Sequence, residues 1–525
     1  MESSDEIFGI KKGRELLDRY FSLLLVFLTA FLVLFPYTGA GFIGDDAQLS
    51  TQQGLISMGE ISIQSYTYDG LINWMMNGRL FPTTVLASVL QWQIIQTPLA
   101  YHLFASVLIL LALGIFYKLI LVQTNRHSTA QIALLITLAC FQARDYHDPI
   151  LSYHPLMDLV TIGLLLSFLF FIQFLRFSSS TDLRRSFSCF LITLLSYEVG
   201  VPFAIVFPIL VWFVRPQDRS ALLKSLGFIV LSLLYVVVSA VLRNKAPSIY
   251  NGIGFGSLHD YFAAFIYQTT SVLPLISFVA PPWWKIVTAA PSPSLFQLLL
   301  ALITGICGAL SLSRILRSTS PVKRGSIPFA FFVIPLSLLF IPPAVLALSG
   351  KYQFELRWGL GYLPVYLQAF GFGSLLAPFL QHRGALLQSI LPTIFGLILA
   401  ATSLSNSRMV DYRNLYWKDQ RSLIQNALEN NFFQDLPEKT ALYIINKALW
   451  DVPAFYFQHG KIRVNCLDWK TAKQTPLPPY YLLHYKITNS LTKEGELVLE
   501  KFSKNGTSEQ KRFFYSPKTT PVLPP

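Results

Sequence analysis

Residues 20–36 read YFSLLLVFLTAFLVLFP, and residues 44–48, which follow shortly after this run, read GDDAQ. The run carries no charge, and with its flanking residues it approaches the roughly 20 apolar residues that a helix needs to cross a bilayer. It is longer than the apolar core of a secretory signal and lacks a clear A-x-A cleavage site. We therefore interpret it as a retained membrane anchor that leads directly to two adjacent acids.

The rest of the chain is also rich in apolar residues and poor in charged ones. Of its 525 residues, 53% are hydrophobic and only 13% are charged, whereas soluble globular proteins carry about 25% charged residues. Too few charges remain to solvate a soluble surface of this size. The composition excludes an ordinary cytosolic enzyme, a disordered chain and a disulfide-rich secreted domain, and it predicts an α-helical polytopic membrane protein.

The apolar runs predict about eleven transmembrane helices. The stretch 186–213 is either one long span or a hairpin of two short spans that meet at residues 197–200. The hairpin is favoured, because a Glu beside Gly and Pro suits a break between helices better than the middle of a span. The other predicted spans lie near 20–38, 101–122, 128–143, 155–175, 225–242, 293–312, 327–348, 359–380 and 385–404.

The charges predict the orientation of these spans. The net charge is +13, but most basic residues form short clusters between apolar runs, as the positive-inside rule expects, and no dense basic segment indicates nucleic acid. This places the N-terminus in the cytoplasm and the loops 39–100, 144–154 and 351–357 outside a plasma membrane, the inner one in a bacterium. The four cysteines form neither a disulfide framework nor a zinc motif.

Two domains are predicted. Residues 1–404 form the transmembrane part, with 39–100 as its first external loop. Polar residues become frequent near residue 405, and short alternating stretches at 440–445, 461–464 and 496–502 predict strands. We expect a helix over 411–430 and then a small external α/β domain, so that the second domain covers 405–525.

The acidic pair Asp45 and Asp46 is the most informative feature. Two adjacent carboxylates at a membrane boundary are costly unless they are solvated or used. They are either a helix cap in a wet loop, or a general base with a neighbouring carboxylate that raises its pKa. Either Asp45 or Asp46 can be this base.

Arg79 and Glu198 are two further candidates. Arg79 lies in the stretch Trp74-Met-Met-Asn-Gly-Arg79-Leu-Phe-Pro82, where it can pair with an acid, bind a lipid phosphate or anchor the loop at the interface. Glu198 is an intramembrane acid, which is by default a functional candidate, and its partner would be Arg79 or Arg144. The alternative for Glu198 is a protonated structural acid.

The loop 144–154 is dense in polar side chains: Arg144, Asp145, His147, Asp148 and His154. Its spacing matches no strict metal motif, so no metal ligand is assigned, and the divalent ion that such side chains would suit is Mg or Mn. Hydrogen bonding to a sugar or phosphate is favoured over metal binding, and a merely polar turn is the alternative.

The external loop Lys351-Tyr352-Gln-Phe-Glu-Leu-Arg357 carries two cations against the general charge bias. Arg357 offers a bidentate fork and Lys351 a point charge, as phosphate recognition requires. The loop therefore binds either one particular lipid phosphate or the headgroups of bulk lipid.

This layout resembles the GT-C glycosyltransferases, membrane enzymes that use polyprenyl-phosphate-linked sugars. An anchor followed by an acidic pair, a long first loop, many spans and an external C-terminal domain are shared as architecture over residues 1–404. Short segments resemble O-antigen glucosyltransferases and protein-mannosyltransferase-like proteins, among which Asp-Glu often stands where this chain has Asp-Asp. Those segments are Asp45-Asp46, Trp74–Arg79, Ser196-Tyr197-Glu198 and Lys351–Tyr362.

The resemblance implies an inverting glycosyltransferase of cell-envelope polysaccharide biosynthesis. Asp45 or Asp46 would activate an acceptor hydroxyl on a glycan, lipid or protein. The polyprenyl phosphate would leave already charged, so it needs cations rather than a proton, and Arg79, Arg144, Lys351 and Arg357 fit that need. His147, Asp148, Glu198 and Tyr352 complete the predicted substrate-binding set.

A polytopic transporter or lipid-linked-sugar flippase is the rival prediction. Transporters usually show internal repeats and ionisable residues near the bilayer midplane. This sequence shows no repeat, and its candidate residues gather on one predicted face. The enzyme is therefore favoured.

Overall fold

The computed structural model divides the chain into two compact units. Unit 1 comprises Met1–Gly39, Tyr68–Ser88 and Tyr101–Val410, and unit 2 comprises Ala40–Thr67, Val89–Ala100 and Asp411–Pro525. The structure describes residues 20–43, 46, 49, 50, 52, 56, 59, 61–95, 97–144, 147–245, 256–280, 283–318, 328–381, 385–436, 441–444, 463–466, 480–489, 494–502 and 508–515.

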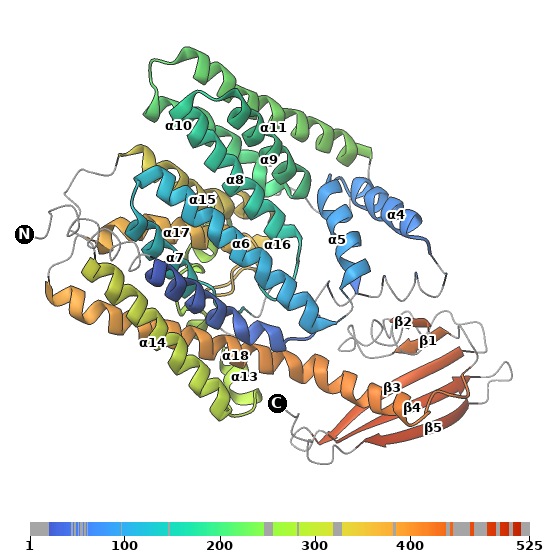
Figure 1. The fold of residues 1–525 in the computed structure, drawn as a ribbon. Helices are drawn as coiled ribbons and strands as arrows, with labels where there is room; N and C mark the ends of the chain where they lie inside the picture. The colour runs from blue at the N-terminus through green and yellow to red at the C-terminus, as the bar shows by residue number, and fades with distance from the viewer. Residues whose placement is uncertain are drawn as a thin grey trace, which may run out of the picture. The chain divides into compact units, whose positions relative to one another are not determined.

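The described residues form a helical polytopic membrane protein (Figure 1). Seven of its helices are long and apolar enough to cross a membrane: Tyr20–Gly39, whose last turn is the 3-10 helix η1 (Phe35–Gly39), and helices α6 (Pro98–Thr124), α8 (Leu156–Phe177), α11 (Arg219–Lys245), α14 (Leu295–Ser318), α15 (Ala330–Ala347) and α18 (Ala385–Glu429). Three shorter apolar segments are α7 (His127–Ala139), η2 (Glu198–Ile205) with α10 (Val206–Val214), and α17 (Val365–Leu380). With the amphipathic α9 (Ser180–Ser196), they occupy the eleven predicted positions.

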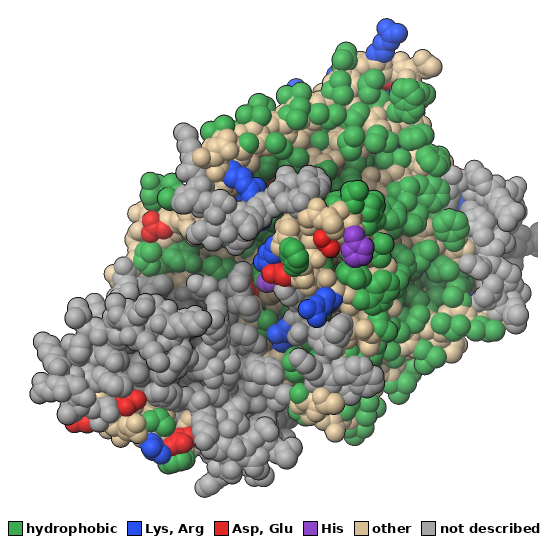
Figure 2. Space-filling model, turned by 180° about the vertical axis from the view of Figure 1, so that it is seen from behind, with side chains coloured by type: hydrophobic (Ala, Val, Ile, Leu, Met, Phe, Trp, Pro, Cys, Tyr) green, Lys and Arg blue, Asp and Glu red, His purple; other side chains and the backbone are tan. Residues whose placement is uncertain are grey.

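Apolar side chains cover much of the surface, which is unlike a soluble protein. Figure 2 shows them spread over most of the described part of the visible face. On α11, Leu223, Leu233 and Val237 are 69%, 58% and 58% exposed, and Leu302 on α14 is 56% exposed. Such helices satisfy their backbone groups internally, so an apolar exterior is stable in lipid.

The stretch 186–213 is a hairpin, as predicted. Helix α9 ends at Ser196, Tyr197 is extended with φ −163°, and η2 begins at Glu198. The chain then returns to the end from which α9 started, because Arg215 Nη1 donates to Ser178 Oγ at 2.8 Å. Glu198 therefore lies at the turn of the hairpin.

Two sets of loops lie at opposite ends of the unit 1 helices. At one end, Thr129 donates to Gln381 Oε1 at 3.1 Å and Gln381 Nε2 donates to Ser128 Oγ at 3.0 Å, which joins the start of α7 to the end of α17. The other end holds the chain after α7, the hairpin turn and the chain before α17. We call it the site end.

Several short elements lie at the site end. They are α4 (Ile63–Met76), α5 (Pro82–Ile94), α12 (Leu258–Thr270), η3 (Ile276–Val279), α13 (Trp283–Ala289) and α16 (Gly350–Glu355). Helix α12 begins with a capping box between Ser257 and Asp260 and packs against α15 and α16. Among the described helices it is not one of the candidate spans.

Helices α14 and α18 cross with their backbones in contact. A Cβ added at Gly305 would lie 2.7 Å from Gly396 O, and one at Gly396 would lie 2.7 Å from Gly305 O and 2.9 Å from Ala309 Cβ. Small residues at such crossings let membrane helices approach closely. Backbone atoms cannot yield as a flexible side chain can, so these glycines fix the crossing.

We expect Gly396→Val to lower the stability of the folded protein by about 1–3 kcal/mol or more, the usual cost of overpacking. The measurement is the thermal unfolding midpoint in detergent. Gly114→Val on α6 is the matched control, because a Cβ there meets open space. Equal midpoints for the two variants would contradict the contact between α14 and α18.

Unit 2 contains a five-stranded sheet of order β2-β1-β3-β4-β5. β1 (Ala441–Ile444) is parallel to β2 (Arg463–Cys466) and to β3 (Tyr480–Asn489), and β3, β4 (Glu494–Phe502) and β5 (Ser508–Tyr515) are antiparallel. The strands predicted at 440–445, 461–464 and 496–502 correspond to β1, β2 and β4. Helix α18 runs through residue 405 without interruption, and the division between the units falls after Val410.

Candidate functional site

An ion pair between Arg79 and Glu198 is the centre of the site end. Arg79 Nη2 lies 2.6 Å from Glu198 Oε1, and the two side chains are 22% and 41% exposed. The guanidinium carbon of Arg79 lies 4.5 Å from the ring centroid of Phe81, 5.4 Å from Trp74 and 5.8 Å from Tyr197. The sequence predicted Arg79 as one of two partners for Glu198, and this pairing is confirmed.

The turn that carries Arg79 is fixed on both sides. Gly78 has φ +73°, and a Cβ there would lie 2.8 Å from Arg243 Cβ of α11. Tyr235 of α11 donates to Leu80 O at 3.2 Å. Glycine is required where the backbone is left-handed and a neighbouring helix lies this close, so the local sequence holds Arg79 in place.

The charge of Arg79 is secure despite its partial burial. Burial acts to lower the pKa of Arg79, but the Glu198 carboxylate and the Tyr197 hydroxyl raise it, and the net shift is upward. The guanidinium is therefore a permanent cation with aromatic rings around it and a carboxylate on one edge. Such a group can hold an anion in a bidentate fork.

Arg144 and Asp148 hold the loop 144–154 together. Arg144 Nη1 donates to Gln142 O at 2.9 Å and its Nη2 donates to Ser271 O at 2.8 Å. Asp148 accepts from the backbone N–H groups of Arg144, Ile150 and Leu151 at 2.7–2.9 Å. Burial raises the pKa of Asp148, while Arg144 and these N–H donors oppose the rise. Arg144 and Asp148 are therefore buried residues whose hydrogen bonds hold the backbone of the loop.

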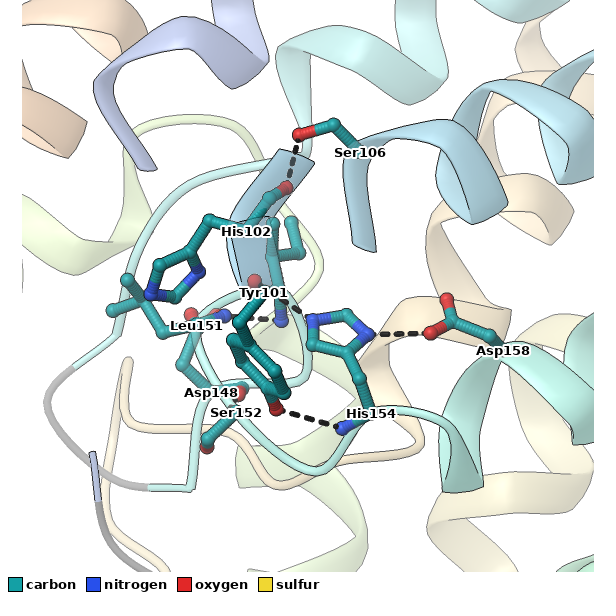
Figure 3. A network of polar contacts seen from close by, with 9 residues as sticks. Tyr101, His102, Ser106, Asp148, Leu151, Ser152, His154 and Asp158 are labelled. Atoms are coloured by element: carbon teal, nitrogen blue, oxygen red, sulfur yellow. Dashed lines mark hydrogen bonds and ion pairs between the residues drawn. The ribbon is translucent and has the colours of Figure 1, made fainter. Parts of the chain in front are cut away.

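The same loop continues into a buried histidine–aspartate pair (Figure 3). His154 Nδ1 faces the carboxylate of Asp158 in the first turn of α8, and its Nε2 lies 3.0 Å from Ile150 O. The hydroxyl of Tyr101 on α6 accepts from His154 N at 3.3 Å. The contacts tie the loop to α6 and α8.

His147 belongs to the same loop and has different partners from the buried pair. Its φ is +40° and that of Tyr153 is +66°, left-handed values that are uncommon for side chains of this size. The His147 ring is hydrogen-bonded to the Tyr153 hydroxyl and meets the Tyr362 ring edge to face, with centroids 5.3 Å apart. Such strained residues tend to cluster at functional sites.

The predicted loop with Lys351 and Tyr352 joins this group. Lys351 and Tyr352 lie on α16, and the Tyr352 ring centroid is 4.3 Å from that of Tyr362. Lys351 is ion-paired with Glu355 at 3.8 Å, and its Nζ lies 5.6 Å from the Tyr352 ring. Arg357 follows α16 with an exposed side chain.

The described member of the acidic pair, Asp46, does not belong to unit 1. Asp46 belongs to unit 2, is 1% exposed and accepts from Ser50 N through its backbone carbonyl at 2.9 Å, which forms one helical turn. Nearby in unit 2, Phe42 packs edge to face on Trp92, with centroids 5.1 Å apart. Asp45 and Asp145 lie outside the described residues. No group of three or more His, Cys, Asp or Glu side chains suited to a metal ion occurs among the described residues.

Unit 1 thus brings together Arg79, Glu198, His147, Lys351 and Tyr352, all of which the sequence predicted. The residues that join them, Tyr197 and Tyr362, lay in segments noted for their family resemblance but were not chosen. Gln268 gave no signal at all, because a glutamine in an apolar helix is not distinctive. The left-handed Gly359 and Gly361, which flank Leu360 just before Tyr362, were the available clue.

No family model and no curated protein matches this sequence. Among solved structures, the chain is similar to ArnT from Cupriavidus metallidurans bound to undecaprenyl phosphate, with a TM-score of 0.43 and 14% identity over 88% of this chain and 92% of that chain. The apo state of the same protein gives a TM-score of 0.39 and 13% identity over the same shares.

Proposed function

We propose that this protein is a membrane glycosyltransferase that moves a sugar from a polyprenyl-phosphate carrier to an acceptor hydroxyl. The observation that carries the proposal is the Arg79 guanidinium, paired with Glu198 and surrounded by Phe81, Trp74 and Tyr197. Lys351 is the second cation. Its Nζ lies over the ring of Tyr352, and that ring packs on the ring of Tyr362. A phosphate that departs as an anion needs such oriented cations.

The proposed reaction is a single displacement. A carboxylate at Asp45 or Asp46 accepts the proton of the acceptor hydroxyl, whose oxygen forms a bond to the anomeric carbon of the sugar. The bond from that carbon to the phosphate oxygen breaks, and its electron pair stays on the polyprenyl phosphate. The configuration at the anomeric carbon inverts. Arg79 and Lys351 bind the phosphate both before and after the transfer.

The other predicted residues take different parts in the proposal. Arg144 and Asp148 position the loop 144–154, because Arg144 Nη1 and Nη2 and both carboxylate oxygens of Asp148 already contact the backbone. His147 and Tyr352 support Tyr362, and Arg357 supplies exposed positive charge for the lipid headgroup. A divalent metal ion such as Mg or Mn would add charge at the phosphate, and transfer with and without a chelator tests that addition.

The proposed location is a plasma membrane, with the N-terminus in the cytoplasm and the site end and residues after 405 outside. The acceptor is then a cell-envelope glycan, lipid or protein. Reporter fusions after residues 218 and 405 check this orientation. A cytoplasmic reporter signal after residue 405 would overturn the external site.

The function is tested with the full-length protein in lipid vesicles and a panel of polyprenyl-phosphate-linked hexoses and pentoses. We expect release of free polyprenyl phosphate together with loss of the sugar from the lipid, followed by mass spectrometry. Vesicles without the protein are the control. Absence of release with every donor, in the presence of envelope extracts as acceptor, would refute the proposed activity.

A lipid-linked-sugar flippase is the second candidate. The buried His154 and Asp158 pair at the start of α8 favours it, since paired ionisable groups at a membrane boundary also occur in proton-coupled carriers. The same vesicles separate the two functions. A flippase changes the leaflet that holds the sugar-lipid but releases no polyprenyl phosphate.

A further inference from the structure

The backbone of Tyr362 is held by the side chain of one residue, Gln268 of α12. Gln268 Oε1 accepts from Tyr362 N at 2.9 Å, and its Nε2 donates to Tyr362 O at 3.2 Å. Gln268 Nε2 also donates to Gln368 Oε1 of α17 at 2.9 Å, and both glutamines are fully buried. A buried amide with its partners satisfied is rigid, since breaking any bond leaves a polar group unpaired.

The chain before Tyr362 is bent tightly onto the segment after α12. Gly359 and Gly361 have φ +78° and +65°. A Cβ at Gly359 would lie 2.9 Å from Ile276 O, and one at Gly361 would lie 2.8 Å from Ser271 Oγ. These contacts leave one path for the chain, and that path points the Tyr362 side chain into the site end.

The side chain of Tyr362 contacts three separate elements. Its ring lies on that of Tyr352 from α16 and against that of His147 from the loop 144–154. Its hydroxyl lies within hydrogen-bonding reach of the hydroxyls of Tyr197, at the hairpin turn, and Tyr352. Tyr362 is only 8% exposed, so it is a buried junction and not a surface platform.

The two cations of the proposed phosphate site contact the partners of Tyr362. Lys351 Nζ lies 5.6 Å from the ring centroid of Tyr352 on α16, and the guanidinium carbon of Arg79 lies 5.8 Å from that of Tyr197. Helix α16 is only six residues long, too short to hold its own position. Its placement therefore depends on contacts such as that between Tyr352 and Tyr362.

We propose that Tyr362 is a positioning residue that sets Lys351 and Arg79 for the phosphate of the donor lipid. The proposal rests on the proposed function and deepens it, because it assigns the alignment of the two cations to one side chain. Tyr362 touches neither the sugar nor the acceptor. Its loss weakens phosphate binding without removing any group that reacts.

The test compares Tyr362→Phe with Tyr366→Phe. Tyr366 lies on α17, is fully buried, and its hydroxyl has no hydrogen-bond partner among the described residues, so it controls for the loss of one buried hydroxyl. The probe is a polyprenyl monophosphate in detergent micelles, and the Kd is measured by tryptophan fluorescence. Hydrogen exchange of residues 350–357 is measured on the same samples without lipid.

We expect Tyr362→Phe to raise the Kd, and the KM for the sugar-lipid, by about 3- to 10-fold, as the loss of one or two hydrogen bonds implies. The kcat should change less than about twofold, because positioned binding is lost and not the chemistry. Exchange of residues 350–357 should become faster. Tyr366→Phe should leave all four quantities unchanged.

The outcomes separate this inference from the proposed function. Unchanged exchange or an unchanged Kd in Tyr362→Phe would overturn the positioning role even if the protein transfers sugar. If wild-type protein does not bind the lipid phosphate at all, the proposed function fails. Faster exchange in Tyr362→Phe would then show the link to α16 alone, and the role toward phosphate would be rejected.

Discussion

Replacing both Asp45 and Asp46 with Asn is expected to reduce sugar transfer by about 10²- to 10⁴-fold, the usual contribution of a general base. Asparagine has nearly the same size and still forms hydrogen bonds, but it cannot take the acceptor proton. Asp46 is 1% exposed, so it is well shielded from bulk water. The measurement is the initial rate of polyprenyl phosphate release by the full-length protein in vesicles.

The single variants and one matched control complete this experiment. Either Asp45→Asn or Asp46→Asn should reproduce most of the loss, which identifies the base. Asp69→Asn on α4 is the control, since Asp69 is an exposed acid of the same region and should leave transfer unchanged. Full transfer by the double variant would show that neither carboxylate is the base.

Removing the Arg79 guanidinium is the second large effect. We expect Arg79→Ala to lower kcat/KM by about 10²- to 10³-fold, as the loss of one oriented donor to a developing anion does in other enzymes. Arg79→Lys should recover only part of the rate, because an ammonium has no planar fork to lie among Phe81, Trp74 and Tyr197. The measurement is kcat/KM for the sugar-lipid.

Glu198 should act through Arg79, and a double-variant cycle shows this. Glu198→Gln removes the negative charge beside Arg79 and should cost less than Arg79→Ala, while the double variant should be no worse than Arg79→Ala alone. Arg185→Ala breaks an exposed ion pair with Asp182 and serves as the control, with little expected effect. Fully additive losses at Arg79 and Glu198 would contradict the dependence.

The sequence predicted features that depend on local patterns. Apolar runs placed the helices, and the Glu-Val-Gly-Val-Pro stretch at 198–202 placed the hairpin turn. The scarcity of charge in an apolar chain also limited the predicted partner of Glu198 to Arg79 or Arg144, and the structure shows Arg79. Strands β3 and β5 were missed, because YYLLHYKITN does not alternate apolar with polar residues and the first five residues of SEQKRFFY are all polar.

The rest of the site depends on contacts between distant segments. Arg144 was predicted to bind substrate, but its Nη2 donates to Ser271 O, 127 residues away. No local pattern distinguishes an arginine that awaits a phosphate from one that serves a distant backbone carbonyl. Gln268 and Tyr362 are 94 residues apart, and their pairing follows from how α12 and α17 pack. Such pairings become visible only in three dimensions.

The hydrogen bonds between the Gln268 side chain and the backbone of Tyr362 determine which substitutions this position tolerates. Because the amide satisfies the N–H and the C=O of residue 362, the loop keeps its path whichever side chain stands there. The side chain at 362 is thus separated from the folding of the loop. Exchanging it should therefore alter the contacts with Tyr352 and His147 while the backbone of the loop stays where Gln268 holds it.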